Sequence, residues 1–219
     1  MTPMKNILAL SFVFALSAFV PAVAVDGHDH LVQEPAEVIE LLKLKETDMY
    51  EGEKDAPIQV VEYASMTCGH CADFHTKHYH EIKEKLIDTG KVRFVFRELP
   101  WDNRALAASM VARCAPTGEY FNFISALMST RDTWATSDDF LGSIKKIARL
   151  GGMAPADVDT CMKNETVNDI VRKSYAEATG PMQVKGTPTF FVNGQRVPGV
   201  MTTDILVEMI AGIEENAAK

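Results

Sequence analysis

Two cysteines separated by two residues give this chain its clearest chemistry. Cys68 and Cys71 enclose Gly69 and His70 in the order Cys-Gly-His-Cys. A pair with this spacing can form and break a disulfide, and it can also supply two ligands to zinc. A structural zinc site normally needs a second pair of ligands, and the other two cysteines have no partner two residues away. The pattern therefore favours disulfide exchange over a zinc site or a purely structural bridge.

The segments on either side of this pair predict how it is held. Residues 58–64 (IQVVEYA) are rich in β-branched and aromatic side chains, which is typical of a strand. Residues 72–89 have helical spacing, because large side chains recur at steps of four from Phe74 to Leu86. Residues 92–96 (VRFVF) predict a second strand. The pair would then open a helix inside a β-α-β unit.

This position predicts different roles for the two thiols. Exposed N–H groups and the helix dipole at a helix N-terminus favour a thiolate, which is the nucleophile in disulfide exchange. Cys68 is the expected nucleophile, and His70 adds positive charge beside it. Cys71 lies inside the first helical turn and is expected to resolve the mixed disulfide. Gly69 completes the predicted catalytic motif.

Glu62 is a carboxylate in an otherwise apolar strand. A central strand covered by helices on both faces would bury it. A buried carboxylate near a thiol can take up its proton, so Glu62 is a candidate proton acceptor for Cys71. The alternative is an ion-paired or edge carboxylate.

A second motif, Gly186-Thr187-Pro188-Thr189-Phe190, precedes a late strand. A proline just before a strand is ordinary punctuation. A cis bond before Pro188 would instead turn the chain sharply beside the cysteine pair, although only about 5% of X–Pro bonds are cis. Such a turn leaves backbone groups free to pair with an extended substrate, so Thr187 and Pro188 are candidate substrate-binding residues.

Together, VVEYASMTCGHCADFH (60–75), GTPTFFVNG (186–194) and the helical block between them resemble the DsbA-like branch of the thioredoxin superfamily. The resemblance covers roughly residues 49–216. It implies an α/β, thioredoxin-like fold in residues 49–219, with an inserted helical domain at about 103–180. It also implies that Pro188 is cis and packs against the active disulfide, and that Glu62 is the family's buried acid.

The resemblance further implies exchange with reduced or misoxidised exported proteins and reoxidation by a DsbB-like membrane partner. No metal or organic cofactor is needed beyond the Cys68–Cys71 disulfide. The Gly-His dipeptide resembles protein disulfide isomerase, and Thr187 resembles isomerase-type bacterial members. DsbA and the isomerase differ by about 60 mV, or nearly 3 kcal/mol for two electrons. Bacterial isomerases of this kind usually carry a dimerisation domain ahead of the thioredoxin part, and residues 25–48 are too few to form one. We therefore expect a monomeric oxidase, with an isomerase or reductase as the alternative.

The remaining cysteines and histidines suggest further sites. Cys114 and Cys161 fall in the helical block, and an even cysteine count in an oxidising compartment suggests that they form a structural disulfide. Free buried thiols and a second redox pair are the alternatives. Cys71, His75 and His78 share a helix face at a spacing that could bind copper or zinc. A periplasmic metal-binding thioredoxin-like protein is therefore the runner-up function.

The first 24 of the 219 residues predict a secretory signal peptide. An apolar run at 7–20 follows Lys5, and Ala22-Val23-Ala24 fits a cleavage site. The run is shorter than the roughly 20 residues that span a bilayer, which disfavours the alternative of an uncleaved anchor. Residues 25–48 predict a lead and a short helix. Removing Lys5 with this segment changes the net charge from −8 to −9, so nucleic acid is a poor partner, and the expected location is the periplasm.

Overall fold

The computed structural model describes residues 34–217, and these belong to one compact unit. The predicted signal peptide lies outside the described residues, as does most of the lead. Within the described part of the chain, no helix is both long enough and apolar enough to cross a membrane.

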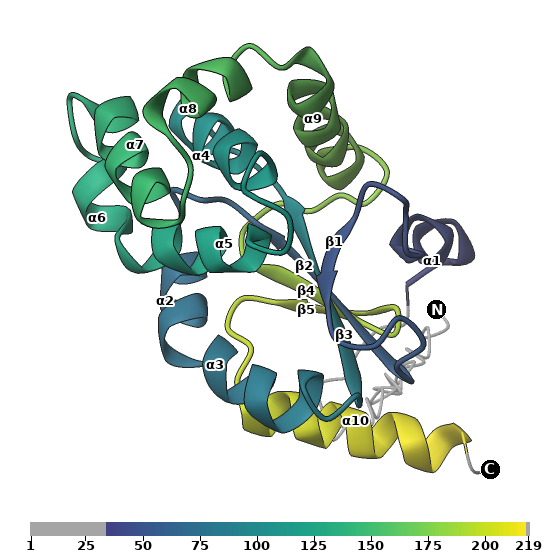
Figure 1. Ribbon diagram of the computed structural model, residues 1–219. Coiled ribbons are helices and arrows are strands. Elements are labelled where there is room, and N and C mark those ends of the chain that lie inside the picture. Colours follow the sequence, from purple (N-terminus) through teal and green to yellow (C-terminus); the bar gives the residue numbers. More distant parts are fainter. Residues whose placement is uncertain (1–33, 218–219) are drawn as a thin grey trace, which may run out of the picture. The chain divides into compact units, whose positions relative to one another are not determined.

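A five-stranded mixed sheet occupies the centre of this unit, in the order β1-β3-β2-β4-β5 (Figure 1). The central strand β2 (Ile58–Ala64) runs parallel to β3 (Val92–Glu98) and antiparallel to β4 (Thr189–Val192). At the edges, β1 (Met49–Glu51) pairs antiparallel with β3, and β5 (Gln195–Pro198) pairs antiparallel with β4. The predicted β-α-β unit is present, and β4 and β5 form a hairpin that turns at Asn193-Gly194.

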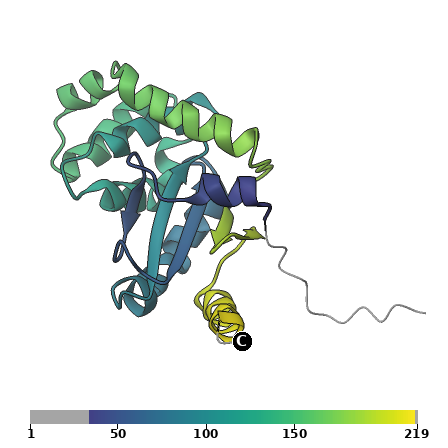
Figure 2. The same cartoon turned by 90° about the vertical axis from the view of Figure 1, so that its right-hand side faces the viewer.

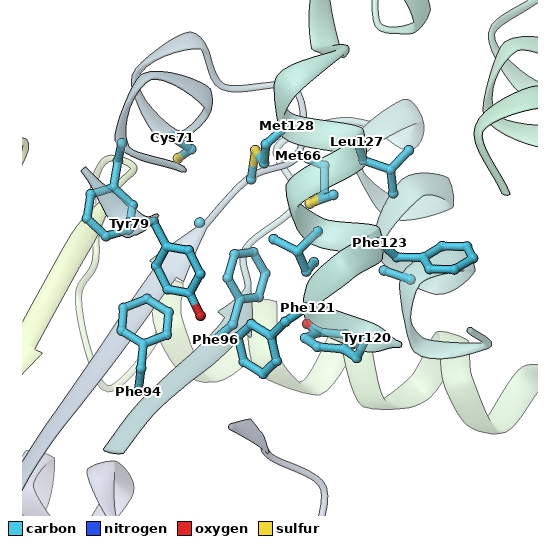
Figure 3. Close-up of a cluster of buried hydrophobic side chains, with 14 of the residues drawn as sticks. Met66, Cys71, Tyr79, Phe94, Phe96, Tyr120, Phe121, Phe123, Leu127 and Met128 are labelled. Atoms are coloured by element: carbon cyan, nitrogen blue, oxygen red, sulfur yellow. The ribbon is translucent and has the colours of Figure 1, made fainter. Parts of the chain in front are cut away.

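Helices cover both faces of the sheet, which explains the continuous apolar runs of β2 and β3. One face packs against α2 (Gly69–Lys77), α5 (Tyr120–Ser129) and α10 (Thr203–Ala217). Its aromatic cluster joins β3 to α5 and reaches Cys71 (Figure 3). The opposite face packs against α1 (Ala36–Leu42) and the end of α9 (Glu165–Thr179), which lie on the same side of the sheet in Figure 2.

The segment after the cysteine pair departs from the single helix predicted over residues 72–89. The first helix, α2, ends at Lys77, and its C-cap residue His78 has a φ of −124°, which is not helical. The chain continues as α3 (Tyr79–Ile82) and a π-helical turn at Lys83–Ile87. Of the two histidines in this region that were grouped with Cys71, His75 is buried and His78 is only half-buried.

All the helices between β3 and β4 lie in residues 103–179. The helices not yet given bounds are α4 (Asn103–Arg113), α6 (Arg131–Trp134), α7 (Phe140–Leu150) and α8 (Pro155–Cys161). The buried carboxylate of Glu98 anchors this block to the end of β3. It accepts hydrogen bonds from the Arg113 guanidinium at 2.6 and 2.7 Å and from the Tyr120 hydroxyl at 2.7 Å. A charged pair that is both buried and fully bonded fixes α4 and α5 in one orientation.

A disulfide between Cys114 and Cys161 closes the helical block on itself. Cys114 caps the end of α4, and Cys161 is the last residue of α8. The two Cα atoms are 6.1 Å apart, and 47 residue positions separate the cysteines in the sequence.

Replacing both Cys114 and Cys161 with alanine is expected to lower the free energy of unfolding by about 4 kcal/mol, because the unfolded chain regains the entropy of an open loop of this length. Urea unfolding of the two proteins, each with Cys68 and Cys71 reduced, measures the difference. A loss of under about 1 kcal/mol would contradict the entropic role assigned to this bridge.

Candidate active site

The sheet topology brings three connections to one edge. The carboxyl ends of β2 and β3 lie at the same edge because these strands are parallel. The start of β4 lies there too, because β4 is antiparallel to β2. The connection after β2 leads to Cys68, the one before β4 carries Thr187-Pro188, and the one after β3 carries Trp101.

Cys68 is the N-cap residue of α2, as the sequence predicts. Its backbone is extended, with φ −75° and ψ 125°, and the helix begins at Gly69. The carbonyl of Cys68 accepts the first hydrogen bond of the helix from Ala72 N–H at 3.1 Å. The thiol is half-buried, so a second protein can reach it.

The surroundings of Cys68 stabilise its thiolate. The pKa of Cys68 falls from an ordinary value of 9.0 to about 5, mainly because the Cys71 thiol donates a hydrogen bond to it. Partial burial acts in the opposite direction, while the Thr187 side chain and the backbone N–H groups of Cys71 and His70 lower the pKa further. This stabilisation of the reduced protein is present in full above pH 9 and is lost as the pH falls through about 5.

Cys71 has the opposite character. Its side chain is buried, and burial raises its pKa well above the ordinary range. The hydrogen bond to Cys68 and the charge of Glu62 raise the pKa further. The pair therefore contains one half-buried thiolate and one buried thiol that keeps its proton.

The Thr187–Pro188 bond is cis, and its loop faces the cysteine pair. The Thr187 carbonyl accepts a hydrogen bond from the Cys68 thiol at 3.3 Å. Pro188 is buried, and its carbonyl accepts from Gly199 N–H at 3.0 Å. The two motifs, 119 residues apart in the sequence, thus meet at one point.

Glu62 is completely buried in the middle of β2, opposite Phe96 on one neighbouring strand and Phe190 on the other. Its Oε2 atom is 2.9 Å from Nε2 of His75, which is itself buried on α2. Glu62 Oε1 and His75 Nδ1 have no hydrogen-bond partner among the described residues. One carboxylate oxygen thus remains available inside the core, on the side of the sheet that carries α2.

Sequence reasoning missed this role of His75. It grouped His75 with Cys71 and His78 as a potential metal site, but His75 turns to Glu62, and the helix ends before His78. Among residues 34–217, no three His, Cys, Asp or Glu side chains converge to hold a metal ion. The available signal was the spacing of four between Cys71 and His75, which places both on the side of α2 that packs on β2.

The dipeptide between the cysteines is exposed. His70 reaches Cys68 through its backbone N–H. A Cβ atom added at Gly69 would meet no atom within 4 Å, so packing does not require glycine there.

Replacing Thr187 with valine is expected to raise the pKa of Cys68, because valine cannot donate a hydrogen bond to the thiolate. The ultraviolet absorbance of the thiolate, followed against pH, should have a midpoint near 5 in the unmodified protein and a higher midpoint in the variant. Thr76→Val is the matched control, because the Thr76 hydroxyl bonds only to carbonyls of its own helix. An unchanged midpoint in the Thr187 variant would contradict this assignment.

Comparison with known proteins extends this picture. Residues 44–211 match the family model described as thioredoxin. A Rickettsia bellii protein, provisionally described as a protein-disulfide oxidoreductase, is 32% identical over 91% of this chain and 78% of its own length. A Rickettsia conorii protein of the same description is also 32% identical, and this chain spans only 64% of its length.

Solved structures agree with the relatives. The crystal structure of Wolbachia pipientis alpha-DsbA1 superposes with a TM-score of 0.76 at 30% identity, covering 82% of this chain and 97% of that one. The fold expected from the sequence, an α/β thioredoxin-like fold with a helical insertion, is thereby confirmed. The chain belongs to the thioredoxin family, and within it to the DsbA-like protein thiol:disulfide oxidoreductases.

Proposed function

We propose that this protein introduces disulfides into exported proteins, using the Cys68–Cys71 pair as oxidant. The observation that supports this most directly is the low pKa of Cys68, about 5. A thiolate stabilised to this extent favours the reduced enzyme, and an enzyme whose reduced form is stabilised readily gives its disulfide away.

The reaction proceeds in two exchanges. A substrate thiolate attacks Sγ of Cys68 in the oxidised enzyme, the Cys68–Cys71 bond breaks, and Cys71 leaves with the electron pair and takes up a proton. The second substrate thiolate then attacks the substrate sulfur of the mixed disulfide, and Cys68 leaves as a thiolate. The substrate loses two electrons, which the enzyme gains. Because its pKa is low, Cys68 leaves faster in the second exchange than a thiol of ordinary pKa would.

Three further residues have proposed roles in these exchanges. Glu62, through its unpartnered oxygen, passes a proton to and from Cys71, and this fits the effect of its charge on the Cys71 thiol. Thr187 and Pro188 receive the substrate backbone, because their loop lies directly against Cys68. Gly69 and His70 form the exposed surface between the cysteines that an incoming substrate meets.

The proposed location is the periplasm, reached through cleavage after Ala24, and mass spectrometry of the exported protein would read an N-terminus at Val25 if this is correct. Retention of residues 1–24 would contradict cleavage.

The proposed partners are reduced or misoxidised exported proteins and a DsbB-like membrane protein that reoxidises the pair. The protein is proposed to act as a monomer.

The first test is the equilibrium of the Cys68–Cys71 pair with a glutathione redox series. We expect a reduction potential of about −120 mV, as in strongly oxidising enzymes of this type. A reduction potential of about −180 mV or below would overturn the oxidase assignment and favour the isomerase or reductase alternative.

Single-cysteine variants test the roles of the two thiols in the same reaction. Cys68→Ser should lose all exchange activity, because no exposed thiolate remains. Cys71→Ser should accumulate mixed disulfides, because its Cys68 thiolate can still attack a substrate disulfide, while Cys71 is no longer present to attack Cys68 and release the substrate. Gel electrophoresis without reductant detects these adducts, and their appearance on Cys68→Ser in place of Cys71→Ser would reverse the assignment.

A further inference from the structure

The connection between β3 and α4 contacts both the segment that leads to Cys68 and the loop that carries Thr187. Leu99 N–H donates to the Ala64 carbonyl at 2.7 Å, at the end of β2. The Thr67 hydroxyl, next to Cys68, donates to the Asp102 carboxylate at 2.6 Å. Between these two contacts, the indole Nε1–H of Trp101 donates to Oγ1 of Thr187 at 3.2 Å.

From this geometry we infer that Trp101 is a positioning residue that turns the Thr187 hydroxyl toward the Cys68 thiolate. The indole nitrogen can only donate, so Oγ1 of Thr187 must be the acceptor in their hydrogen bond. The single O–H of Thr187 is then left to donate elsewhere, and the Thr187 side chain does lower the pKa of Cys68. Trp101 thus acts on the nucleophile through the hydroxyl of Thr187.

Burial does not account for the position of Trp101. Its side chain is 44% exposed, and it rests on Tyr175 of α9, with ring centroids 6.0 Å apart and ring planes at 82°. The other tryptophan, Trp134, is fully buried and donates its indole N–H to the Leu127 carbonyl, as a core residue would. Trp101 instead places its one polar atom beside the reactive loop.

Few other groups act on the Cys68 thiolate from the surrounding elements. From α2 it receives hydrogen bonds from Cys71 and from the backbone of His70, and from the cis-proline loop it receives that of Thr187. Asp102, the N-cap residue of α4, and Arg131, the first residue of α6, are both bonded to Thr67, next to Cys68. All of these remain in a Trp101 variant, so a change there reports on the indole alone.

Trp101→Phe tests the inference, because it keeps an aromatic ring next to Tyr175 and removes the N–H donor. The thiolate absorbance titration should give a higher pKa for Cys68. The equilibrium constant for oxidation of glutathione by the enzyme disulfide should fall about fivefold, the effect of losing one hydrogen bond of ordinary strength. Tyr175→Phe is the matched control and should change neither quantity.

A double variant separates positioning from a general loss of structure. In a Thr187→Val background, Trp101→Phe should have no further effect on the Cys68 pKa, because the hydroxyl it orients is gone. A Trp101→Phe protein with the original pKa and equilibrium constant would overturn the inference, as would equal effects in both backgrounds.

The inference rests on the proposed function only in its link to oxidising strength. The absorbance titration needs no substrate and no turnover. If the unmodified enzyme fails to oxidise substrate, the proposed function fails, while the Cys68 pKa of Trp101→Phe still decides whether Trp101 has the inferred role.

Discussion

The pairing of β2 with β3 on one side and β4 on the other is the constraint on which the site depends. Because one neighbour is parallel and the other antiparallel, the connections after β2, after β3 and before β4 meet at one sheet edge. A one-residue slip of β2 against β4 would turn Glu62 to the opposite face, away from His75. The register that opposes Glu62 to Phe190 therefore fixes the core acid and the active-site edge together.

A single hydrogen bond between the two thiols accounts for much of their difference. When Cys71 donates to the Cys68 thiolate, the pKa of Cys68 falls and that of Cys71 rises. For Cys71, burial raises the pKa more than this hydrogen bond does, because its side chain lies within the apolar cluster that α2 forms with β3 and α5. Helix geometry produces this asymmetry: the N-cap position leaves Cys68 at the surface, and the first turn carries Cys71 into the core.

The sequence was sufficient for the features that depend on local pattern. The strand before Cys68, the helix that starts after it and the hairpin at Asn193-Gly194 each follow from neighbouring residues. The strand Met49–Glu51 did not, because three residues in a charged, turn-rich segment become a strand only by pairing with the edge of β3.

Other features of the site depend on distant contacts that no local pattern encodes. The bond between Glu62 and His75 crosses from strand β2 to helix α2, and the sequence pattern had placed His75 in a potential metal site. The contact between Trp101 and Thr187 joins residues 86 positions apart. The cis state of Thr187–Pro188 was expected through family resemblance, since the physics of the dipeptide alone gives it a low frequency.

The insertion between β3 and β4 also sets an order of completion during synthesis. A ribosome makes both redox cysteines, then the helices with Cys114 and Cys161, and only afterwards Thr187 and Pro188. A nascent chain that has reached the end of α9 contains all four cysteines but lacks the loop that faces Cys68. The unfinished molecule therefore has the Cys68–Cys71 dithiol without the loop that completes the active site, and the last fifth of the chain supplies that loop.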